Sequence, residues 1–196
     1  GGNVLLVSYA NFEGEKFTGL SYPTKTLNET SMTGCTNLEP TSAIVDSLGR
    51  LRIHEDIANN NDGWPYAVQA LALYWDVEPR LDGNAIFLGD RLRAPLGQFG
   101  NTYIDFPLID AGTRYLSEGA AGFCALDILD LANATSEGAE EWRYVFGDKI
   151  VLVGDTWVLT HDKYNTPSGS VYGVEIIVGA ISTMMNGAPA TSEYVG

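Results

Sequence analysis

Residues 149–187 read KIVLVGDTWVLTHDKYNTPSGSVYGVEIIVGAISTMMNG. The opening segment, KIVLVG, is a short β-branched run without polar alternation, which predicts a strand covered on both faces. The closing segment has apolar residues at i, i+3, i+4, i+7, i+10 and i+11, the pattern of an amphipathic helix with one face in the core. That stripe consists of Val174, Ile177, Val178, Ile181, Met184 and Met185. A strand, a polar loop and a helix in this order indicate an α/β domain.

The upstream sequence extends this pattern. A short apolar run at 4–9 predicts a buried strand, and the Gly-, Thr-, Asn- and Ser-rich stretch 11–40 predicts a long surface excursion. A helix is expected to begin near Gly63, with Pro65 in its first turn. Further strands are predicted on both sides of the turn in 42–54 and at 84–89 and 102–106, and a second helix at 123–131. The predicted fold class is α/β, with a mixed or mostly parallel sheet flanked by helices.

Length and composition limit the classes of function. With 196 residues, 45% of them hydrophobic, the chain can bury one core, so we treat 1–196 as a single domain excised from a longer protein. The formal net charge is -14, from 25 acidic against 11 basic residues, and the basic residues form no cluster. Nucleic acid and anionic membrane surfaces are therefore excluded as expected partners.

The loop after the first predicted strand contains Asp155, His161 and Asp162. Two carboxylates and an imidazole suit a divalent cation or an activated water, which would fit a small metal-dependent hydrolase. The alternative, which we favour, is that the aspartates accept hydrogen bonds from loop amides. Because His54 and His161 are the only histidines, one chain cannot form a multi-histidine zinc site.

Other enzyme motifs lack support. A single glycine follows the predicted strand, so neither a dinucleotide-binding nor a phosphate-binding glycine motif is present. The segment GSVYG has the spacing of a nucleophile elbow, but Val171 occupies the position of the serine. We therefore expect no catalytic residue and no cofactor.

The two cysteines, Cys35 and Cys124, lie far apart in the sequence. A disulfide between them would contribute on the order of 4 kcal/mol in the loop-entropy description. Two separate buried thiols are an equal alternative. The residues alone leave both open.

The closing stretch resembles the CHASE2 domain family. The shared positions follow the order of the family signature: Gly154, Asp162, Thr166, Pro167, Gly173, Val174, Glu175 and Gly187. A weaker match upstream consists of Asp46, Gly49 and Arg52 and of the aromatic–proline start of the helix. The chain departs from the family at Ile177-Val178, where members carry His-Ala, and it lacks a portion that typical members have before residue 3.

The resemblance implies an extracytoplasmic (periplasmic or extracellular) sensory domain, not an enzyme, anchored by flanking transmembrane helices. Its cytoplasmic output domain would be an adenylate cyclase, a histidine kinase or a Ser/Thr kinase. The signal would be a small molecule or peptide that the family does not specify, and the receptor would form a homodimer. The candidate ligand-binding or signature residues are Asp155, His161, Asp162, Thr166, Pro167, Glu175, Asp46 and Arg52. Glu175 also suits the positive end of the last helix, and Arg52 could pair with Asp46 or Asp162.

Overall fold

The structure is a computed structural model of residues 1–196. It describes residues 4–14, 16–29, 31–36, 50–52, 63–97, 101–104, 140, 143–155, 162–166 and 169–187. The predicted helix at 123–131 and most of the predicted turn in 42–54 lie outside these ranges.

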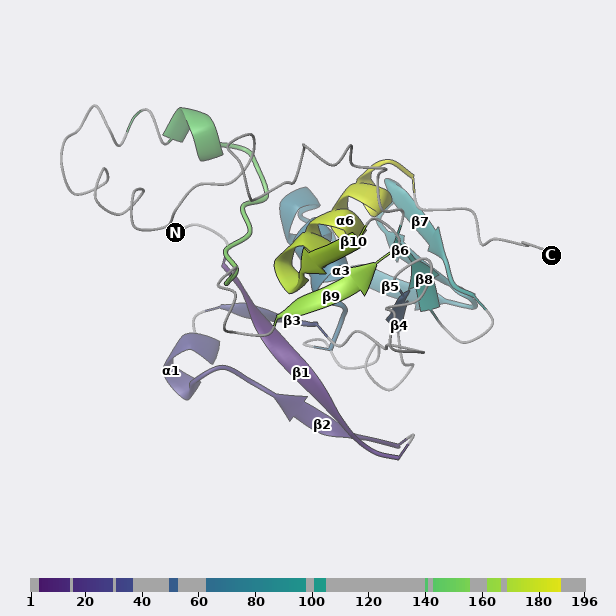
Figure 1. The fold of residues 1–196 in the computed structure, drawn as a ribbon. Helices are drawn as coiled ribbons and strands as arrows, with labels where there is room; N and C mark the ends of the chain where they lie inside the picture. The colour runs from purple at the N-terminus through teal and green to yellow at the C-terminus, as the bar shows by residue number, and fades with distance from the viewer. Residues whose placement is uncertain are drawn as a thin grey trace.

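The N-terminal part forms a three-stranded sheet with the order β2-β1-β3 (Figure 1). Its strands are β1 (Leu5–Glu13), β2 (Lys16–Ser21) and β3 (Met32–Cys35), and the short helix α1 (Lys25–Asn28) precedes β3. β1 pairs antiparallel with β2 and parallel with β3. The strand predicted at 4–9 is thus confirmed, but it is not buried as predicted, because Val7 and Tyr9 are exposed. The described part of 11–40 contains β2, α1 and β3, so its interpretation as a long surface excursion is wrong there. Along β1 the side chains alternate between the two faces of the sheet: Ser8 and Ala10 are buried, and Val7 and Tyr9 are exposed. A search for long apolar runs does not detect this alternation.

Helix α3 (Tyr66–Trp75) lies at the centre of the described core. Pro65 directly precedes the helix, as its N-cap, with φ −51°, close to the value that the proline ring imposes. Ala67, Val68 and Leu71 have no solvent exposure. The helix contacts β1, β3, β5, β6 and α6. The predicted helix is confirmed.

A second three-stranded sheet, antiparallel throughout, packs on the other side of α3. It consists of β5 (Pro79–Asp82), β6 (Ala85–Leu88) and β7 (Leu92–Pro95). Fully buried Ile86 and Leu88 of β6 join the core cluster. The short strands β4 (Arg50–Arg52) and β8 (Asn101–Tyr103) form a separate antiparallel pair. The strands predicted at 84–89 and 102–106 are confirmed at β6 and β8, with shorter bounds.

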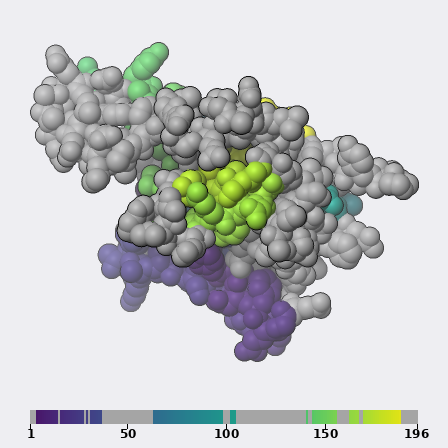
Figure 2. Space-filling view, in the orientation of Figure 1, coloured from purple at the N-terminus to yellow at the C-terminus, as the bar shows by residue number. Residues whose placement is uncertain are grey.

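The C-terminal part consists of a β-hairpin and a helix. The hairpin strands are β9 (Lys163–Thr166) and β10 (Gly169–Tyr172), and α6 (Gly173–Met185) follows directly. α6 buries Ile176, Ile177, Ala180, Ile181 and Met184 and contacts α3. The predicted helix is confirmed. The hairpin lies where the sequence predicted only a loop, and it covers part of the molecular surface in Figure 2.

One prediction about the sheet is wrong and another is confirmed in part. Residues 149–154 form no strand, and their exposure alternates: Ile150 and Leu152 pack against the core, while Val151 is 48% and Val153 85% exposed. The segment is therefore covered on one face and not on two. The sheet was predicted to be mixed or mostly parallel, and the mixed alternative is confirmed in β2-β1-β3, where β1 pairs antiparallel with β2 and parallel with β3. The other strand pairs in the described residues are antiparallel, so a mostly parallel sheet is not found. Mixed helix and strand content remains.

Candidate functional site

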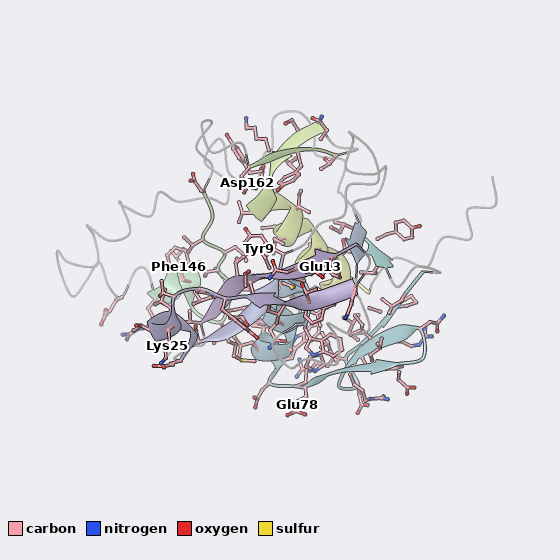
Figure 3. The ribbon with its side chains drawn as sticks, turned by 90° about the horizontal axis from the view of Figure 1, so that it is seen from below. Tyr9, Glu13, Lys25, Glu78, Phe146 and Asp162 are labelled. Atoms are coloured by element: carbon pink, nitrogen blue, oxygen red, sulfur yellow. The ribbon has the colours of Figure 1, made fainter. Side chains whose placement is uncertain are left out.

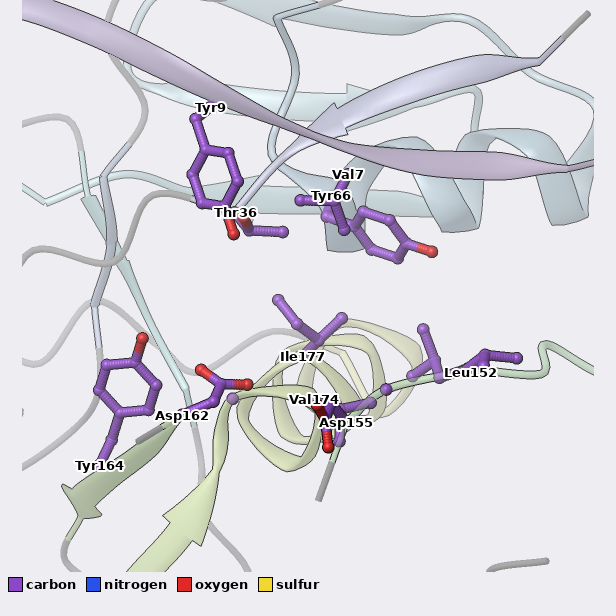
Figure 4. A pocket seen from close by; sticks show the side chains of 13 residues that line it. Val7, Tyr9, Thr36, Tyr66, Leu152, Asp155, Asp162, Tyr164, Val174 and Ile177 are labelled. Carbon is purple, nitrogen blue, oxygen red and sulfur yellow. The ribbon is translucent and has the colours of Figure 1, made fainter. Parts of the chain in front are cut away.

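A pocket of about 240 Å³ lies between β1 and the N-terminal end of α6 (Figure 4). Strand β1 and Tyr66 form one side, and the extended segment 152–155 and the first turn of α6 form the other. Figure 3 shows Tyr9 on the side of the β1–β2–β3 sheet that faces α6. The lining residues are Val7, Tyr9, Thr36, Tyr66, Leu152, Val153, Gly154, Asp155, Asp162, Tyr164, Gly173, Val174 and Ile177. The volume is below the range of about 300–1,000 Å³ typical of drug-sized ligands, so the pocket suits a small metabolite.

Two of the signature residues, Asp162 and Gly173, meet at the start of α6. The Gly173 N–H donates to the backbone carbonyl of Asp162 over 3.1 Å. A Cβ at position 173 would lie 2.6 Å and 2.7 Å from the two carboxylate oxygens of Asp162. Only glycine therefore lets this carboxylate lie against the first turn of the helix.

A second close contact joins Gly154 to Val174, and both residues also belong to the signature. A Cβ at position 154 would lie 2.5 Å from the Cβ of Val174 and 2.7 Å and 2.8 Å from its two methyl groups. The contact holds segment 152–155 against α6. Four signature residues therefore line the pocket: Gly154, Asp162, Gly173 and Val174. The family signature thus coincides with residues that form the pocket walls.

Tyrosines contribute much of the polar lining. Partial burial and the adjacent negative charge of Asp162 raise the pKa of Tyr164 above its ordinary value. Burial likewise raises the pKa of Tyr66, whose hydroxyl donates to the carbonyl of Leu5 over 3.2 Å. Both phenols therefore stay protonated at neutral pH and can donate hydrogen bonds.

Glu175 and Thr166 have local contacts. A Glu175 carboxylate oxygen accepts a hydrogen bond from the Tyr172 backbone N–H over 2.7 Å, which satisfies an N–H group before the first turn of α6. The Thr166 hydroxyl donates to the Gly169 carbonyl over 2.8 Å and closes the β9–β10 turn. Neither residue lines the pocket.

The structure brings Asp155 and Asp162 to the same pocket. Asp155 is exposed, as is the rest of segment 153–155. His161, Pro167 and Asp46 lie outside the described residues, and Arg52 is described only as part of β4. Among the described residues, no group of three or more His, Cys, Asp and Glu side chains is placed to hold a metal ion.

The pocket residues that were not predicted from the sequence include four polar ones: Tyr9, Thr36, Tyr66 and Tyr164. Tyr9 and Thr36 fall in or beside a stretch interpreted as a strand end and a loop. Tyr66 directly follows Pro65, so the sequence could have placed it at the N-terminus of α3. It could not show that the side chain lines the pocket, because that depends on how α3 packs against β1.

Cys35 is a buried residue at the end of β3, with 5% exposure, and burial raises the pKa of its thiol. Cys124 lies outside the described residues. A disulfide between the two stays a prediction.

The described part of the chain combines helices and small sheets, with a pocket at the N-terminal end of α6. It matches the family model of the CHASE2 domain over residues 22–195, which is most of its length. The chain belongs to the CHASE2 domain family, whose members are extracytoplasmic sensory domains of signalling receptors. No curated protein and no solved structure matches it. No helix in the described ranges is long and apolar enough to span a membrane.

Proposed function

We propose that this domain binds a small ligand outside the cytoplasm and biases a membrane receptor through flanking transmembrane helices. The observation that supports this role is the construction of the pocket from signature residues. Gly154 and Gly173 have no room for a Cβ, and each close contact positions a wall of the pocket. If the signature residues served only core packing, they would not be expected to surround an open pocket.

The same geometry connects the pocket to a helix that can transmit a change. Val174 and Ile177 of α6 line the pocket, and further along the helix Ile181 and Met184 are in the core. A ligand that contacts the first turns of α6 therefore acts on a rigid element, whose displacement reaches the C-terminal part of the domain. The output domain in this proposal is an adenylate cyclase, a histidine kinase or a Ser/Thr kinase, and the receptor is a homodimer.

A pocket-filling variant tests the proposal. Val7→Trp places a large side chain at the pocket, because Val7 lines it and is 41% exposed. Val4→Trp is the matched control, because Val4 is 53% exposed and does not line the pocket. A defined library of amines, carboxylates, alcohols and sugars is screened by thermal shift against the wild type and both variants.

We expect at least one library member to raise the melting temperature of the wild type and of Val4→Trp but not of Val7→Trp. In a receptor that carries this domain, the same compound should change the output activity. A library without any binder, or a binder that Val7→Trp leaves unaffected, would contradict the proposed role.

A further inference from the structure

The charged residues that line the pocket are acidic. Asp155 and Asp162 contribute carboxylates, and none of the described lining residues is a lysine, arginine or histidine. We propose that the ligand is a small organic cation, an ammonium group attached to an apolar body. This inference rests on the ligand-binding role proposed above and adds the chemical class of the ligand.

The N-terminal end of α6 does not reverse the sign of the local charge. A helix N-terminus carries the equivalent of about +0.5 elementary charge. The Asp162 carboxylate, which lies against the first turn, opposes it with a full negative charge, and Glu175 adds a second within the first turn. The next described cation along the chain, Lys163, has its Nζ 4.6 Å from the centroid of the Tyr172 ring, and neither residue lines the pocket. An anionic ligand would therefore enter a region of negative potential.

The remaining lining suits both ends of such a ligand. Aromatic faces attract ammonium groups, and Tyr9, Tyr66 and Tyr164 line the pocket. Leu152, Val174 and Ile177 provide an apolar surface for the rest of the molecule. The volume of about 240 Å³ is below the range of drug-sized ligands, so it limits the ligand to a small molecule. That limit favours a primary amine with a short apolar body.

The wall also contains a hydroxyl oxygen that is shielded from solvent, on the half-buried side chain of Thr36. The Thr36 hydroxyl oxygen is buried and, among the described residues, has no hydrogen-bond partner. A buried hydroxyl without a partner is costly. Rotation about χ1 exchanges the hydroxyl and the methyl group of a threonine. A ligand that donates a hydrogen bond at this wall would therefore satisfy the hydroxyl.

The test compares three compounds with the same phenyl body and different head groups. Phenethylamine is cationic at pH 7, 2-phenylethanol is neutral and 3-phenylpropionate is anionic. Isoamylamine, choline and putrescine extend the set of cations. Each compound is titrated calorimetrically into the wild-type domain, Asp162→Asn and Asp90→Asn. Asp90 is exposed on the turn between β6 and β7, away from the pocket, so its substitution makes the same change in net charge.

We expect at least one of the four cations, which are three primary amines and the quaternary ammonium choline, to bind the wild type. For phenethylamine the affinity should exceed that of 2-phenylethanol by roughly tenfold or more, as for a charge-assisted hydrogen bond, with no detectable binding of 3-phenylpropionate. Asp162→Asn should remove most of this difference, and Asp90→Asn should retain it. Equal or tighter binding of the alcohol or the carboxylate, or no binding of any of the four cations, would overturn the proposal. If another library compound still binds in the pocket, the cation inference alone fails; if none binds, the ligand-binding role fails with it.

Discussion

The carboxylate of Asp162 lies where a side chain on Gly173 would begin. Its two oxygens are 2.6 Å and 2.7 Å from the position of a Cβ at residue 173, and the backbone groups of the same two residues are joined by a 3.1 Å hydrogen bond. One side of the pocket therefore depends on a glycine and an aspartate that are eleven positions apart in the sequence and that both belong to the family signature.

Gly173→Ala should destabilise the domain by about 1–3 kcal/mol, because the new methyl group would overlap the Asp162 carboxylate. Urea unfolding of the wild type, both single variants and the double variant Gly173→Ala/Asp162→Ala measures the coupling. The double variant should recover part of the loss, since Asp162→Ala removes the overlapping atoms. Strictly additive losses would show that the two residues do not compete for this space.

Glu175→Ala should cost about 0.5–2 kcal/mol, because it removes the hydrogen-bond acceptor of the Tyr172 backbone N–H at the start of α6. Glu175→Gln should cost less, since an amide oxygen can still accept. Glu78→Ala is the control, an exposed carboxylate on the opposite side of the molecule in Figure 3. Equal unfolding midpoints for Glu175→Ala and Glu78→Ala would exclude a capping role.

Stability should decrease at alkaline pH. Burial raises the folded-state pKa of Tyr66 above its ordinary value of 10.0, and burial together with Asp162 does the same for Tyr164. A raised folded-state pKa means that the stabilisation is complete below about pH 10 and is lost as the pH rises through the folded-state value. Thermal melts from pH 8 to 11 should therefore fall more steeply for the wild type than for Tyr66→Phe.

Tyr144→Phe provides the control for this titration, because Tyr144 is 88% exposed. Its alkaline melting profile should follow that of the wild type. The prediction is wrong if Tyr66→Phe and Tyr144→Phe melt in parallel over the whole range.

In the reduced, folded protein Cys35 should react slowly with thiol reagents, because it is buried and its raised pKa disfavours the reactive thiolate.

We also predict that Cys35 and Cys124 form a disulfide under oxidising conditions. Alkylation of the unfolded protein with and without prior reduction, followed by intact mass measurement, tests the pairing. Two alkylated cysteines without reduction, in protein prepared under oxidising conditions, would reject it.

The sequence predicted the helices of the described core better than the sheets. α3 and α6 have an apolar face at helical spacing, which is a local signal, and both were found. Strands β2, β5 and β7 are short and half-exposed, and β3 is short and mostly buried but lacks an apolar run, so only their pairing with neighbours identifies them. Segment 149–154 shows the reverse case, because its β-branched composition suits a strand but no described strand pairs with it.

The candidate site was also predicted only in part, because local sequence patterns identify some of its residues and long-range packing places the others. Asp155 and Asp162 follow from the polar loop after an apolar segment, and Gly154 and Gly173 follow from the family signature. Tyr9 and Thr36 are on the opposite wall, more than a hundred residues away along the chain. Only the packing of β1 and β3 against α3 brings them near α6, and no local pattern encodes that distance.

The most direct measurement is amide chemical-shift mapping of the isotopically labelled domain during titration with phenethylamine. If the ligand binds between β1 and α6, the largest amide chemical-shift changes should occur at Tyr9, Thr36, Asp162, Tyr164 and residues 173–177. These changes should saturate as for a single binding site. Asp162→Asn should weaken these changes, and Asp90→Asn should not. Saturable changes centred instead on the β5–β6–β7 sheet, or no saturable change at any amide, would contradict a cation-binding pocket at the start of α6.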